Sequence, residues 1–299
     1  MKSIVTGGAG FIGSHLVERL DNLGHDVVVL DDFSTGEPEN LPKRHMDKAR
    51  IVDITDCDLI SHCEGADYIF HMAARPNVQG SIDHPEVSAY DSLATLKILN
   101  VARKLKVKRV IFSSSCSIYG DAEEIPTTEE ESKKPKSPYA LSKYQGEQYC
   151  RLFSELYGLD SVCLRYFNVY GERQPTKGQY APVIGLFQKQ KADGQLMTVV
   201  GDGEQRRDFT YVKDIVNANI MAALSNADKE AYGKVYNVGS GVNYSVNEVA
   251  AMISENVKYI PPRLGEARIS LANVDKIYNT FAWKPQQNLE EWVKKQIGN

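Results

Sequence analysis

Short apolar runs alternate with amphipathic stretches through the first half of the chain. Runs that predict buried strands cover residues 3–5, 26–30, 51–54, 66–74, 107–112 and 159–167. Between them, apolar positions three or four residues apart predict helices from residue 14, over 85–106 and over 137–158. Strands that alternate with helices at this spacing predict parallel βαβ units and an α/β fold with a doubly wound parallel sheet.

A glycine-rich turn joins the first predicted strand to the first helix. Residues 6–13 read Thr-Gly-Gly-Ala-Gly-Phe-Ile-Gly. Gly7 permits a tight turn, Gly10 allows close approach of a pyrophosphate, and Gly13 allows the helix to pack closely on the strand. Because a helix N-terminus offers unpaired N–H groups to phosphate, this turn predicts a dinucleotide site that includes Phe11 and Ile12.

Two acidic residues end the second strand, about twenty residues after the turn. A carboxylate at Asp31 or Asp32 accepts hydrogen bonds from the hydroxyls of an adenine ribose and repels a 2′-phosphate. No Arg or Lys that could receive such a phosphate occurs in the next four residues, Phe33, Ser34, Thr35 and Gly36. The sequence therefore predicts NAD rather than NADP as the cofactor.

The later strands also end in small or polar residues, at the edge where doubly wound sheets bind ligands. These residues are Asp53, Ile54, Met72, Ala73, Ala74, Ser113, Ser114 and Ser115. Two interpretations of Asp53 stay open, a contact with the adenine edge and an exposed strand end. Small residues after the fourth strand allow close approach to the cofactor. We expect His71 to be a structural histidine rather than a catalytic base.

Beyond residue 168 the regular alternation stops. Helices are expected over 183–193, 212–224, 245–254 and 288–296, and strands over 197–200 and 235–238. We interpret this half as a smaller α/β lobe that binds the substrate. The predicted division is an NAD-binding domain of residues 1–165 plus about 212–240, and a lobe of about 166–211 plus 241–299. The loop at 120–136 is expected to be solvated.

A phenol and an ammonium share one face of the helix that Ser137 caps and Pro138 starts. Tyr139 and Lys143 stand four residues apart. The ammonium and the positive helix end favour the phenolate, so we expect a lowered pKa for Tyr139. The pair alone is typical of many amphipathic helices. Ser115, on a neighbouring strand end, could bind the same substrate oxygen, and the three together predict hydride transfer at a carbinol.

Composition argues against several other classes of protein. The net charge is −4, with no basic excess that indicates nucleic acid or an anionic membrane. No apolar run approaches the roughly 18 residues that cross a bilayer, and no signal-peptide pattern precedes the first strand, so we expect a cytoplasmic protein. The five cysteines form no C-x-x-C pair, which indicates neither a disulfide framework nor a metal site.

Six motifs together resemble one protein family. They are TGGAGFIGSH at 6–15, FSSSCSIYG at 112–120, YALSK at 139–143, RYFNVYG at 165–171, RRDFTYV at 206–212 and RLGE at 263–266. Along essentially its whole length, the chain resembles the extended short-chain dehydrogenase/reductases, and within them it is similar to the UDP-sugar 4-epimerases. The resemblance implies a Rossmann domain with bound NAD, a UDP-sugar substrate, and a homodimer formed through the helices at 86–106 and 139–157.

The resemblance also implies roles for residues that match the family motifs. Tyr139 would be the acid/base, Lys143 would hold the nicotinamide ribose, and Ser115 would orient the sugar 4-hydroxyl. Tyr166 and Phe167 would help to seat the nicotinamide. The implied nucleotide contacts are Asn168, Arg207 and Arg263 at the diphosphate, Glu266 at the ribose, and Val183, Thr198, Val199 and Val200 beside the base.

Two positions distinguish this chain within the family pattern. Related sequences generally carry Asn where Ser92 stands, so a contact near the nicotinamide is expected to be weaker or replaced by water. Ser270 matches the position at which a bulky Tyr excludes N-acetyl groups from the sugar pocket. A serine leaves room for such a group and suggests an N-acetylhexosamine substrate, alone or alongside the plain hexose.

The implied function is an NAD-dependent 4-epimerase of UDP-hexoses that works through a 4-keto intermediate. The alternatives within the superfamily are a nucleotide-sugar 4,6-dehydratase and a UDP-glucuronate decarboxylase. Both usually carry a carboxylate just after the Ser/Thr position, where this chain has Cys116 and Ser117. A further alternative is a non-catalytic NAD-binding regulator, which the intact Ser115, Tyr139 and Lys143 disfavour.

Overall fold

Parallel strands with connecting helices make up most of the computed structural model, which describes residues 1–46, 48–176 and 181–297. The strands are β1 (Lys2–Thr6), β2 (Asp26–Asp31), β3 (Arg50–Ile51), β4 (Tyr68–His71), β5 (Arg109–Ser115), β6 (Ser161–Tyr166), β7 (Val169–Tyr170), β8 (Met197–Val200), β9 (Arg206–Asp208), β10 (Thr210–Tyr211), β11 (Lys234–Val238), β12 (Asn243–Ser245) and β13 (Val257–Ile260). The α-helices are α1 (Phe11–Asn22), α2 (Lys43–Met46), α3 (Leu59–Cys63), α4 (Val78–Asp83), α5 (Val87–Lys104), α6 (Pro138–Tyr157), α7 (Val183–Ala192), α8 (Val212–Leu224), α9 (Val246–Ile253), α10 (Asp275–Phe281) and α11 (Leu289–Ile297). Short 3-10 helices are η1 (Pro38–Asn40), η2 (Cys116–Tyr119) and η3 (Lys229–Ala231).

The main sheet confirms the predicted doubly wound topology. Within the described residues it has seven parallel strands in the order β11-β6-β5-β4-β1-β2-β3. The chain first moves from β1 to β2 and β3, then returns to β4 on the other side of β1. Loops after β1 and β4 therefore diverge at this point, which is where such sheets bind ligands.

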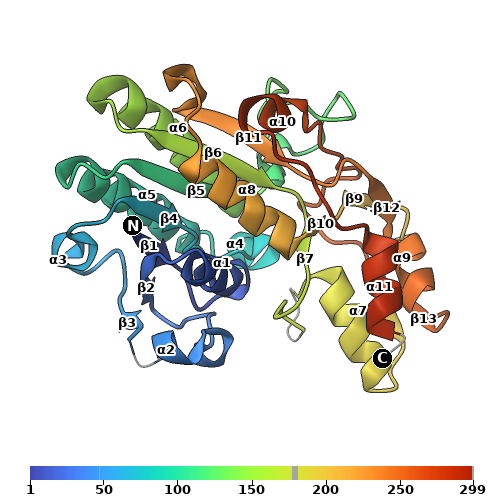
Figure 1. The fold of residues 1–299 in the computed structure, drawn as a ribbon. Helices are drawn as coiled ribbons and strands as arrows, with labels where there is room; N and C mark the ends of the chain where they lie inside the picture. The colour runs from blue at the N-terminus through green and yellow to red at the C-terminus, as the bar shows by residue number, and fades with distance from the viewer. Residues whose placement is uncertain (47, 177–180, 298–299) are drawn as a thin grey trace.

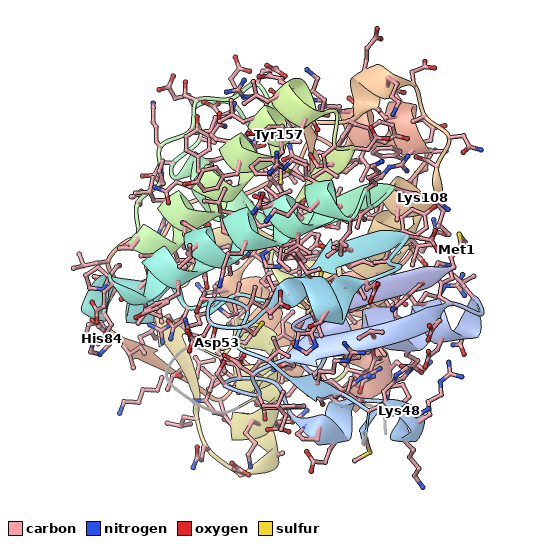
Figure 2. The ribbon with its side chains drawn as sticks, turned by 90° about the vertical axis from the view of Figure 1, so that its left-hand side faces the viewer. Met1, Lys48, Asp53, His84, Lys108 and Tyr157 are labelled. Atoms are coloured by element: carbon pink, nitrogen blue, oxygen red, sulfur yellow. The ribbon has the colours of Figure 1, made fainter. Side chains whose placement is uncertain are left out.

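Helices cover both faces of the sheet, so its strands are buried on both sides. On one face Val5, Phe70 and Ile111 pack with residues of α1 and α8. On the other face Ile4 and Ile69 pack with residues of α5 and α6. Figure 1 shows α8 and α1 in front of the strands, and Figure 2 shows α5 and α6 side by side on another face, with Tyr157 labelled near the end of α6.

Helix α6 begins and ends where its sequence dictates. The Ser137 side chain accepts a hydrogen bond from the Ala140 N–H, Pro138 occupies the first turn, and Gly158 ends the helix with a φ of +67°. At Gly146 the helix comes so close to the sheet that a Cβ would lie 2.4 Å from the Phe112 ring. The predicted helix is confirmed, and it lies directly against β5.

A buried ion pair joins α6 to β6. The Arg165 guanidinium donates to both carboxylate oxygens of Glu147, at 2.8 and 2.7 Å, and both side chains are 1% exposed. Arg165 also donates to the Tyr119 hydroxyl at 2.7 Å, which in turn donates to Asn237 Oδ1 at 2.6 Å. Ser114 donates to Glu147 at 2.6 Å. These bonds tie α6, β5, β6, η2 and β11 together below the strand ends.

Helices α7, α9 and α11 pack with β8 around a second core. Three two-stranded sheets, β10-β7, β12-β9 and β13-β8, occur among the described residues. Their core includes Phe187 of α7, Val249 of α9 and Trp292 of α11, each buried. In Figure 1 these three helices stand together on the right, near the C-terminus. Residues 177–180 and 298–299, which belong to the predicted substrate lobe, lie outside the described part of the chain.

Two sequence-based expectations need correction. The third strand is shorter than 51–54 and ends at Ile51, although Val52 and Ile54 beyond it are buried. The loop at 120–136 is not simply solvated. Thr127 forms a β-bridge with Ala272, and the Glu129 carboxylate accepts the Asn237 N–H at 2.7 Å.

None of the described helices is both long and apolar enough to cross a lipid bilayer.

The buried ion pair gives a stability prediction. Arg165→Met leaves the Glu147 carboxylate buried without its cation, which typically costs about 3–5 kcal/mol. The matched control is Arg151→Met, because Arg151 pairs with Glu155 at 2.8 Å on the surface, where the two side chains are 46% and 54% exposed. That change should cost less than about 1 kcal/mol. Urea unfolding of both variants measures the difference, and equal losses would contradict the prediction.

Candidate active site

A cavity of about 490 Å³ follows the glycine turn along the carboxyl ends of the sheet strands. We call it the glycine-turn cavity. The predicted cofactor residues that line it are Gly7, Gly10, Phe11, Ile12, Gly13, Asp31, Asp32, Ser34, Thr35, Asp53, Ile54, Met72, Ala73, Ala74, Ser113, Tyr139, Lys143 and Tyr166. Its position is the one at which doubly wound sheets bind dinucleotides.

Close packing explains why the turn requires glycine. Gly7 has a φ of +65°, and a Cβ there would lie 2.7 Å from the Ala73 Cα at the end of β4. A Cβ on Gly13 would lie 2.1 Å from the Gly7 carbonyl oxygen. Gly10 is the N-cap of α1 and gives the first helical turn no side-chain cap. The N–H groups of that turn suit a pyrophosphate.

The glycine turn itself holds the Asp31 carboxylate. Asp31 Oδ2 accepts the Ala9 N–H at 2.8 Å, and Oδ1 accepts the Phe33 N–H at 2.9 Å. Burial raises the pKa of Asp31, and the two N–H groups oppose that shift. Each carboxylate oxygen can accept a further hydrogen bond. The arrangement therefore fits ribose hydroxyls, as the sequence predicts.

Asp53 and Arg75 complete the polar rim of this cavity. Asp53 Oδ1 accepts hydrogen bonds from the N–H and the hydroxyl of Thr55, at 2.8 and 2.7 Å, and these bonds lower the pKa of Asp53. Arg75 lines the cavity although no motif indicates it. Its guanidinium lies 3.9 Å from the Asp32 carboxylate and 5.4 Å from the centre of the Tyr90 ring. Its place just after Ala74 is the one signal that could have indicated it.

Three predicted cofactor residues, Phe33, Gly36 and Ser92, are not among the described residues that line the cavity. Gly36 packs against the turn, where a Cβ would lie 2.9 Å from the Ala9 carbonyl carbon. The Ser92 hydroxyl donates to Gln145 Oε1 at 2.6 Å and so joins α5 to α6. Contacts of these three residues with a cofactor stay predictions.

The predicted catalytic side chains meet at one edge of the glycine-turn cavity. Ser115 ends β5, and both Ser115 and Tyr139 line this cavity. The Lys143 ammonium, on a side chain that is 3% exposed, lies 5.9 Å from the centre of the Tyr139 ring. It donates to the Ser113 carbonyl oxygen at 2.8 Å. The parallel register that places Ser115 beside Tyr166 brings β5 and β6 to this same edge.

The protein by itself keeps Tyr139 as a neutral phenol. Burial raises the pKa of Tyr139, and the nearby Ser115 hydroxyl opposes the shift. Burial lowers the pKa of Lys143 to about 8, against the attraction of Asp91. The expectation of a lowered pKa for Tyr139 is therefore wrong for the protein alone, because desolvation outweighs an ammonium that makes no direct contact with the phenol oxygen.

His71 has the structural role that the sequence predicts. Its Nδ1 is hydrogen-bonded to the Thr6 hydroxyl at 2.8 Å, and its Nε2 to the Thr95 hydroxyl at 3.2 Å. Burial lowers the pKa of His71 to about 3. A neutral imidazole with both nitrogens engaged bridges β1, β4 and α5.

A second cavity, of about 390 Å³, adjoins the first. We call it the arginine cavity. The predicted substrate residues that line it are Asn168, Val183, Thr198, Val200, Arg207, Arg263, Glu266 and Ser270. Cys116, Ser117 and Asn168 line both cavities. The two cavities therefore meet at η2, directly after Ser115.

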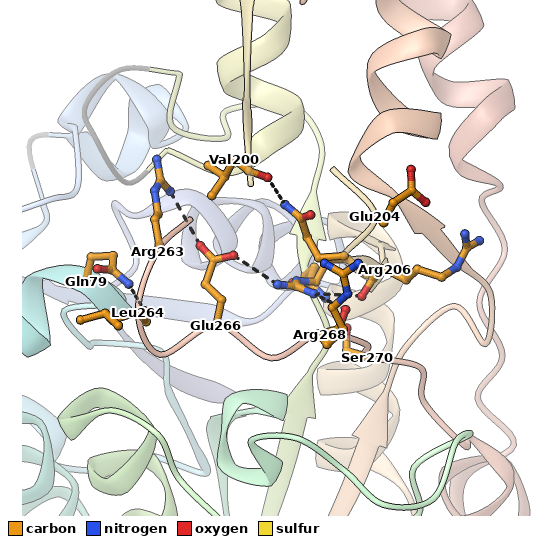
Figure 3. A network of polar contacts seen from close by, with 12 residues as sticks. Gln79, Val200, Glu204, Arg206, Arg263, Leu264, Glu266, Arg268 and Ser270 are labelled. Atoms are coloured by element: carbon orange, nitrogen blue, oxygen red, sulfur yellow. Dashed lines mark hydrogen bonds and ion pairs between the residues drawn. The ribbon is translucent and has the colours of Figure 1, made fainter. Parts of the chain in front are cut away.

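Glu266 lies between the two predicted diphosphate arginines. Its carboxylate is 3.3 Å from the Arg207 guanidinium and 4.0 Å from that of Arg263, and Figure 3 shows Arg263 and Glu266 facing each other. Burial lowers the pKa of Arg207, while the attraction of Glu266 opposes the shift. Gln79 of α4 donates to the Leu264 carbonyl oxygen and so holds the loop that carries Arg263 and Glu266.

Asp208 is a buried carboxylate beside the arginine cavity, and the sequence predicts no role for it. Asp208, 0% exposed, accepts hydrogen bonds from the Ser240 hydroxyl and from the N–H groups of Ser240, Gly241 and Ala272, at 2.7 to 3.1 Å. Its backbone carbonyl accepts the Asn168 amide at 2.9 Å. The same amide donates to the Ser270 hydroxyl at 3.2 Å. Asp208 lies within the RRDFTYV motif, and that motif was the signal for it.

The described residues contain no group of three or more His, Cys, Asp or Glu side chains that could hold a metal ion. The cysteines at 57, 63, 116, 150 and 163 are all free thiols. The groups that could act in catalysis at the glycine-turn cavity are thus the Tyr139 phenol, the Ser115 hydroxyl and the Lys143 ammonium.

Comparison with known proteins agrees with this geometry. Residues 3–239 match the model of the NAD dependent epimerase/dehydratase family. The UDP-glucose 4-epimerase of Mycolicibacterium smegmatis is 37% identical, over 99% of this chain and 97% of that protein.

Solved structures with the same fold include two complexes with nucleotide sugars. UDP-N-acetylglucosamine 4-epimerase from Methanobrevibacter ruminantium, in complex with UDP-N-acetylmuramic acid, has a TM-score of 0.92 and 37% identity, over 99% of this chain and 97% of that one. UDP-glucose 4-epimerase from Thermotoga maritima, with UDP-glucose, has a TM-score of 0.92 and 35% identity, over 100% and 98%.

The lowered pKa of Lys143 predicts a pH dependence of stability. Between pH 8 and 10.5 the unfolded chain keeps this lysine more protonated than the folded protein does. Unfolding therefore takes up a proton, and the contribution of Lys143 to the unfolding free energy rises with pH across that window. In the cofactor-free protein, the difference in unfolding free energy between wild type and Lys143→Met should increase from pH 8 to 10.5. A constant difference would contradict the shift.

Proposed function

Because this chain belongs to the NAD dependent epimerase/dehydratase family, we propose that it is an isomerase that interconverts UDP-hexoses at C4 with NAD as cofactor. The observation that carries the proposal is the meeting of Ser115, Tyr139 and Lys143 where the glycine-turn cavity joins the arginine cavity. A nucleotide in one cavity and a dinucleotide in the other would bring a sugar carbinol and a hydride acceptor together at these side chains.

The residues of the glycine-turn cavity fit the NAD molecule that the family requires. The N-terminus of α1 would bind the pyrophosphate and Asp31 the adenine ribose. Lys143 would hold the nicotinamide ribose, and Tyr166 would lie beside the ring. When bound, NAD⁺ supplies a hydride acceptor and a positive charge at the edge of the site.

Tyr139 is proposed as the acid/base of the reaction. Its phenol oxygen would take the proton of the sugar 4-hydroxyl while C4 loses its hydrogen as hydride, which leaves a 4-keto sugar. Ser115 would hold the same sugar oxygen. Since burial keeps the pKa of Tyr139 high in the protein alone, the phenolate needs added positive charge in the assembled complex. After the keto sugar turns over, hydride returns to its other face and Tyr139 gives the proton back.

The arginine cavity would bind the nucleotide firmly and the sugar loosely. Arg207 and Arg263 suit a diphosphate because guanidinium groups make charge-assisted, bidentate hydrogen bonds with phosphate. Their contacts with Glu266 hold them at the cavity wall before substrate arrives. Glu266 would accept from the ribose, and Val183, Thr198 and Val200 would flank the base. A sugar with few fixed contacts can rotate between the two hydride transfers.

Ser270 supports substrates with an N-acetyl group. It lines the arginine cavity, and its small side chain, which accepts a hydrogen bond from Asn168, leaves space at the position of a bulky family tyrosine. We propose UDP-GlcNAc and UDP-GalNAc as substrates, with UDP-Glc and UDP-Gal as smaller ones that also fit.

The same proposal extends to organisation and location. Residues 1–165 plus about 212–240 would form the NAD-binding domain, and about 166–211 plus 241–299 the nucleotide-sugar lobe. Tyr90 and Leu93 of α5 and Leu152 and Leu156 of α6 are exposed apolar side chains. They support a homodimer built on these two helices, which lie side by side in Figure 2. Free thiols at all five cysteines support work in the reducing cytoplasm.

Tyr139→Phe tests the assignment of the acid/base. The variant keeps the ring but lacks the oxygen that exchanges the proton, so kcat for UDP-sugar epimerisation should fall by at least about 10²-fold. UDP affinity, measured by calorimetry, should stay the same because Tyr139 does not line the arginine cavity. Wild-type turnover in this variant would show that Tyr139 is not the acid/base.

The product of the wild-type enzyme separates the alternatives. A product whose mass differs from that of the UDP-sugar substrate would favour a dehydratase or a decarboxylase over an epimerase.

Ser270→Tyr tests the assignment of the sugar. The added ring should lower kcat/KM for UDP-GlcNAc at least about tenfold relative to UDP-Glc, because it fills the space of the N-acetyl group. Ser270→Ala is the matched control, since it removes the hydroxyl that accepts from Asn168 without adding bulk. It should keep the wild-type ratio of the two substrates. An unchanged ratio in the tyrosine variant would place the N-acetyl group elsewhere.

A further inference from the structure

The glycine-rich motif at 6–15 ends in a histidine that the proposed reaction does not use. His15 lies on α1 and is 4% exposed. Its Nε2 is 2.7 Å from the Glu172 carbonyl oxygen, and its Nδ1 is 2.9 Å from the Arg173 guanidinium. Both partners belong to the loop that leads from β7 toward α7. We call residues 171–176 the β7–α7 loop.

Hydrogen-bond capacity fixes the protonation of His15. A carbonyl oxygen can only accept, so the Nε2 of His15 carries the ring proton and donates to Glu172. The neutral ring then has one acceptor, Nδ1, which receives an N–H of the Arg173 guanidinium. Burial lowers the pKa of His15, which favours this neutral form. His15 therefore binds the β7–α7 loop through both ring nitrogens.

Arg173 makes two further bonds across the same junction. The guanidinium nitrogen that contacts His15 also donates to the Glu18 carboxylate, three residues along α1. A second nitrogen donates to the Asn40 carbonyl oxygen of η1 at 2.8 Å. The Asn40 amide in turn donates to the Ala9 carbonyl oxygen at 3.0 Å, inside the glycine turn. One side chain thus joins the β7–α7 loop to α1 and, through η1, to the turn.

The backbone at Arg173 has a conformation that few residues other than glycine adopt. Its φ is +63°, in the left-handed region, which costs a residue with a side chain roughly 1 kcal/mol or more. A plain turn would be better served by glycine or asparagine at this position. The arginine that stands there is 25% exposed at its side chain. Its contacts therefore outweigh the strain and point to a role for the guanidinium.

The β7–α7 loop forms part of the wall of the glycine-turn cavity. Pro175, two residues after Arg173, lines this cavity, as do Phe11 and Ile12 of α1. The loop also packs on α7, where a Cβ on Gly185 would lie 2.6 Å from the Pro175 carbonyl oxygen. The bonds of Arg173 therefore hold together two walls of the cavity, one from α1 and one from the loop.

We propose that Arg173 is a positioning residue that keeps the β7–α7 loop closed against α1 and so retains NAD in the glycine-turn cavity. The inference rests on the proposed function, in which the hydride taken from the sugar is returned to it. A dinucleotide that left between the two transfers would leave a keto sugar without a hydride donor. Slow release of the cofactor is therefore a requirement of that reaction, and Arg173 meets it through the loop.

The dissociation rate of NADH tests this role directly. NADH is bound to the protein, excess NAD⁺ is added, and the loss of NADH fluorescence gives the rate. Arg173→Met keeps the length of the side chain without its donors, and Arg173→Asn introduces a residue that tolerates the positive φ. In both variants NADH should leave at least about tenfold faster, because lost hydrogen bonds to charged groups act mainly on the dissociation rate.

Arg44→Met is the matched control. Arg44 also binds a carboxylate of α1, since its Nε donates to Asp21 at 2.7 Å, but that bond does not involve the β7–α7 loop. NADH should leave this variant within about twofold of the wild-type rate. UDP affinity, measured by calorimetry, should stay the same in all three variants, because Pro175 is not among the described residues that line the arginine cavity.

The dissociation rates and the UDP affinities decide the inference together. Wild-type dissociation rates in both Arg173 variants overturn it. An equal acceleration in Arg44→Met, or a matching loss of UDP affinity, also overturns it, since either would indicate a general loosening of the protein rather than of the loop. A wild-type protein that retains NADH but does not epimerise UDP-sugars overturns the proposed function alone, and the dissociation rates still decide the role of Arg173.

Discussion

The buried pair between Arg165 and Glu147 is the interaction on which the geometry of the site depends. Two opposite charges that are 1% exposed have lost their water, so each needs the other and further hydrogen bonds to remain in the interior. Ser114 and Tyr119 supply those bonds. The pair links α6 to β6, the strand next to the one that ends in the proposed catalytic Ser115.

That constraint reaches Tyr139 and Lys143, the proposed catalytic residues of α6, through helix periodicity. Glu147 lies one turn beyond Lys143 and two turns beyond Tyr139, on the same face of α6. With Glu147 bound to Arg165 of β6 and Gly146 packed against Phe112, this face of α6 lies against the end of β5, where Lys143 donates to the Ser113 carbonyl oxygen. A polar network below the strand ends therefore orients side chains that it never touches.

The sequence predicts those parts of the molecule that local chemistry dictates. The glycine turn, the Ser137 cap, the sheet topology and most cavity residues follow from spacing, capping and motif. Other features depend on contacts far along the chain. Thr127 forms a β-bridge with Ala272, and the Ser92 hydroxyl donates to Gln145. Neither contact could be predicted from neighbouring residues in the sequence. The pKa of Tyr139 is missed for a related reason, because desolvation depends on everything that surrounds the phenol.

Asp208 and Glu147 organise different sides of the molecule. Glu147 anchors the helix that carries Tyr139 and Lys143, whereas Asp208 holds the segments around Gly241, Ala272 and Asn168 beside the arginine cavity. Each of these two carboxylates is buried with its own hydrogen-bond partners. The effects of substitutions at well-separated sites on stability are usually additive. Substitutions in the segments that Asp208 holds can therefore change the wall of the arginine cavity without disturbing the helix that carries Tyr139 and Lys143.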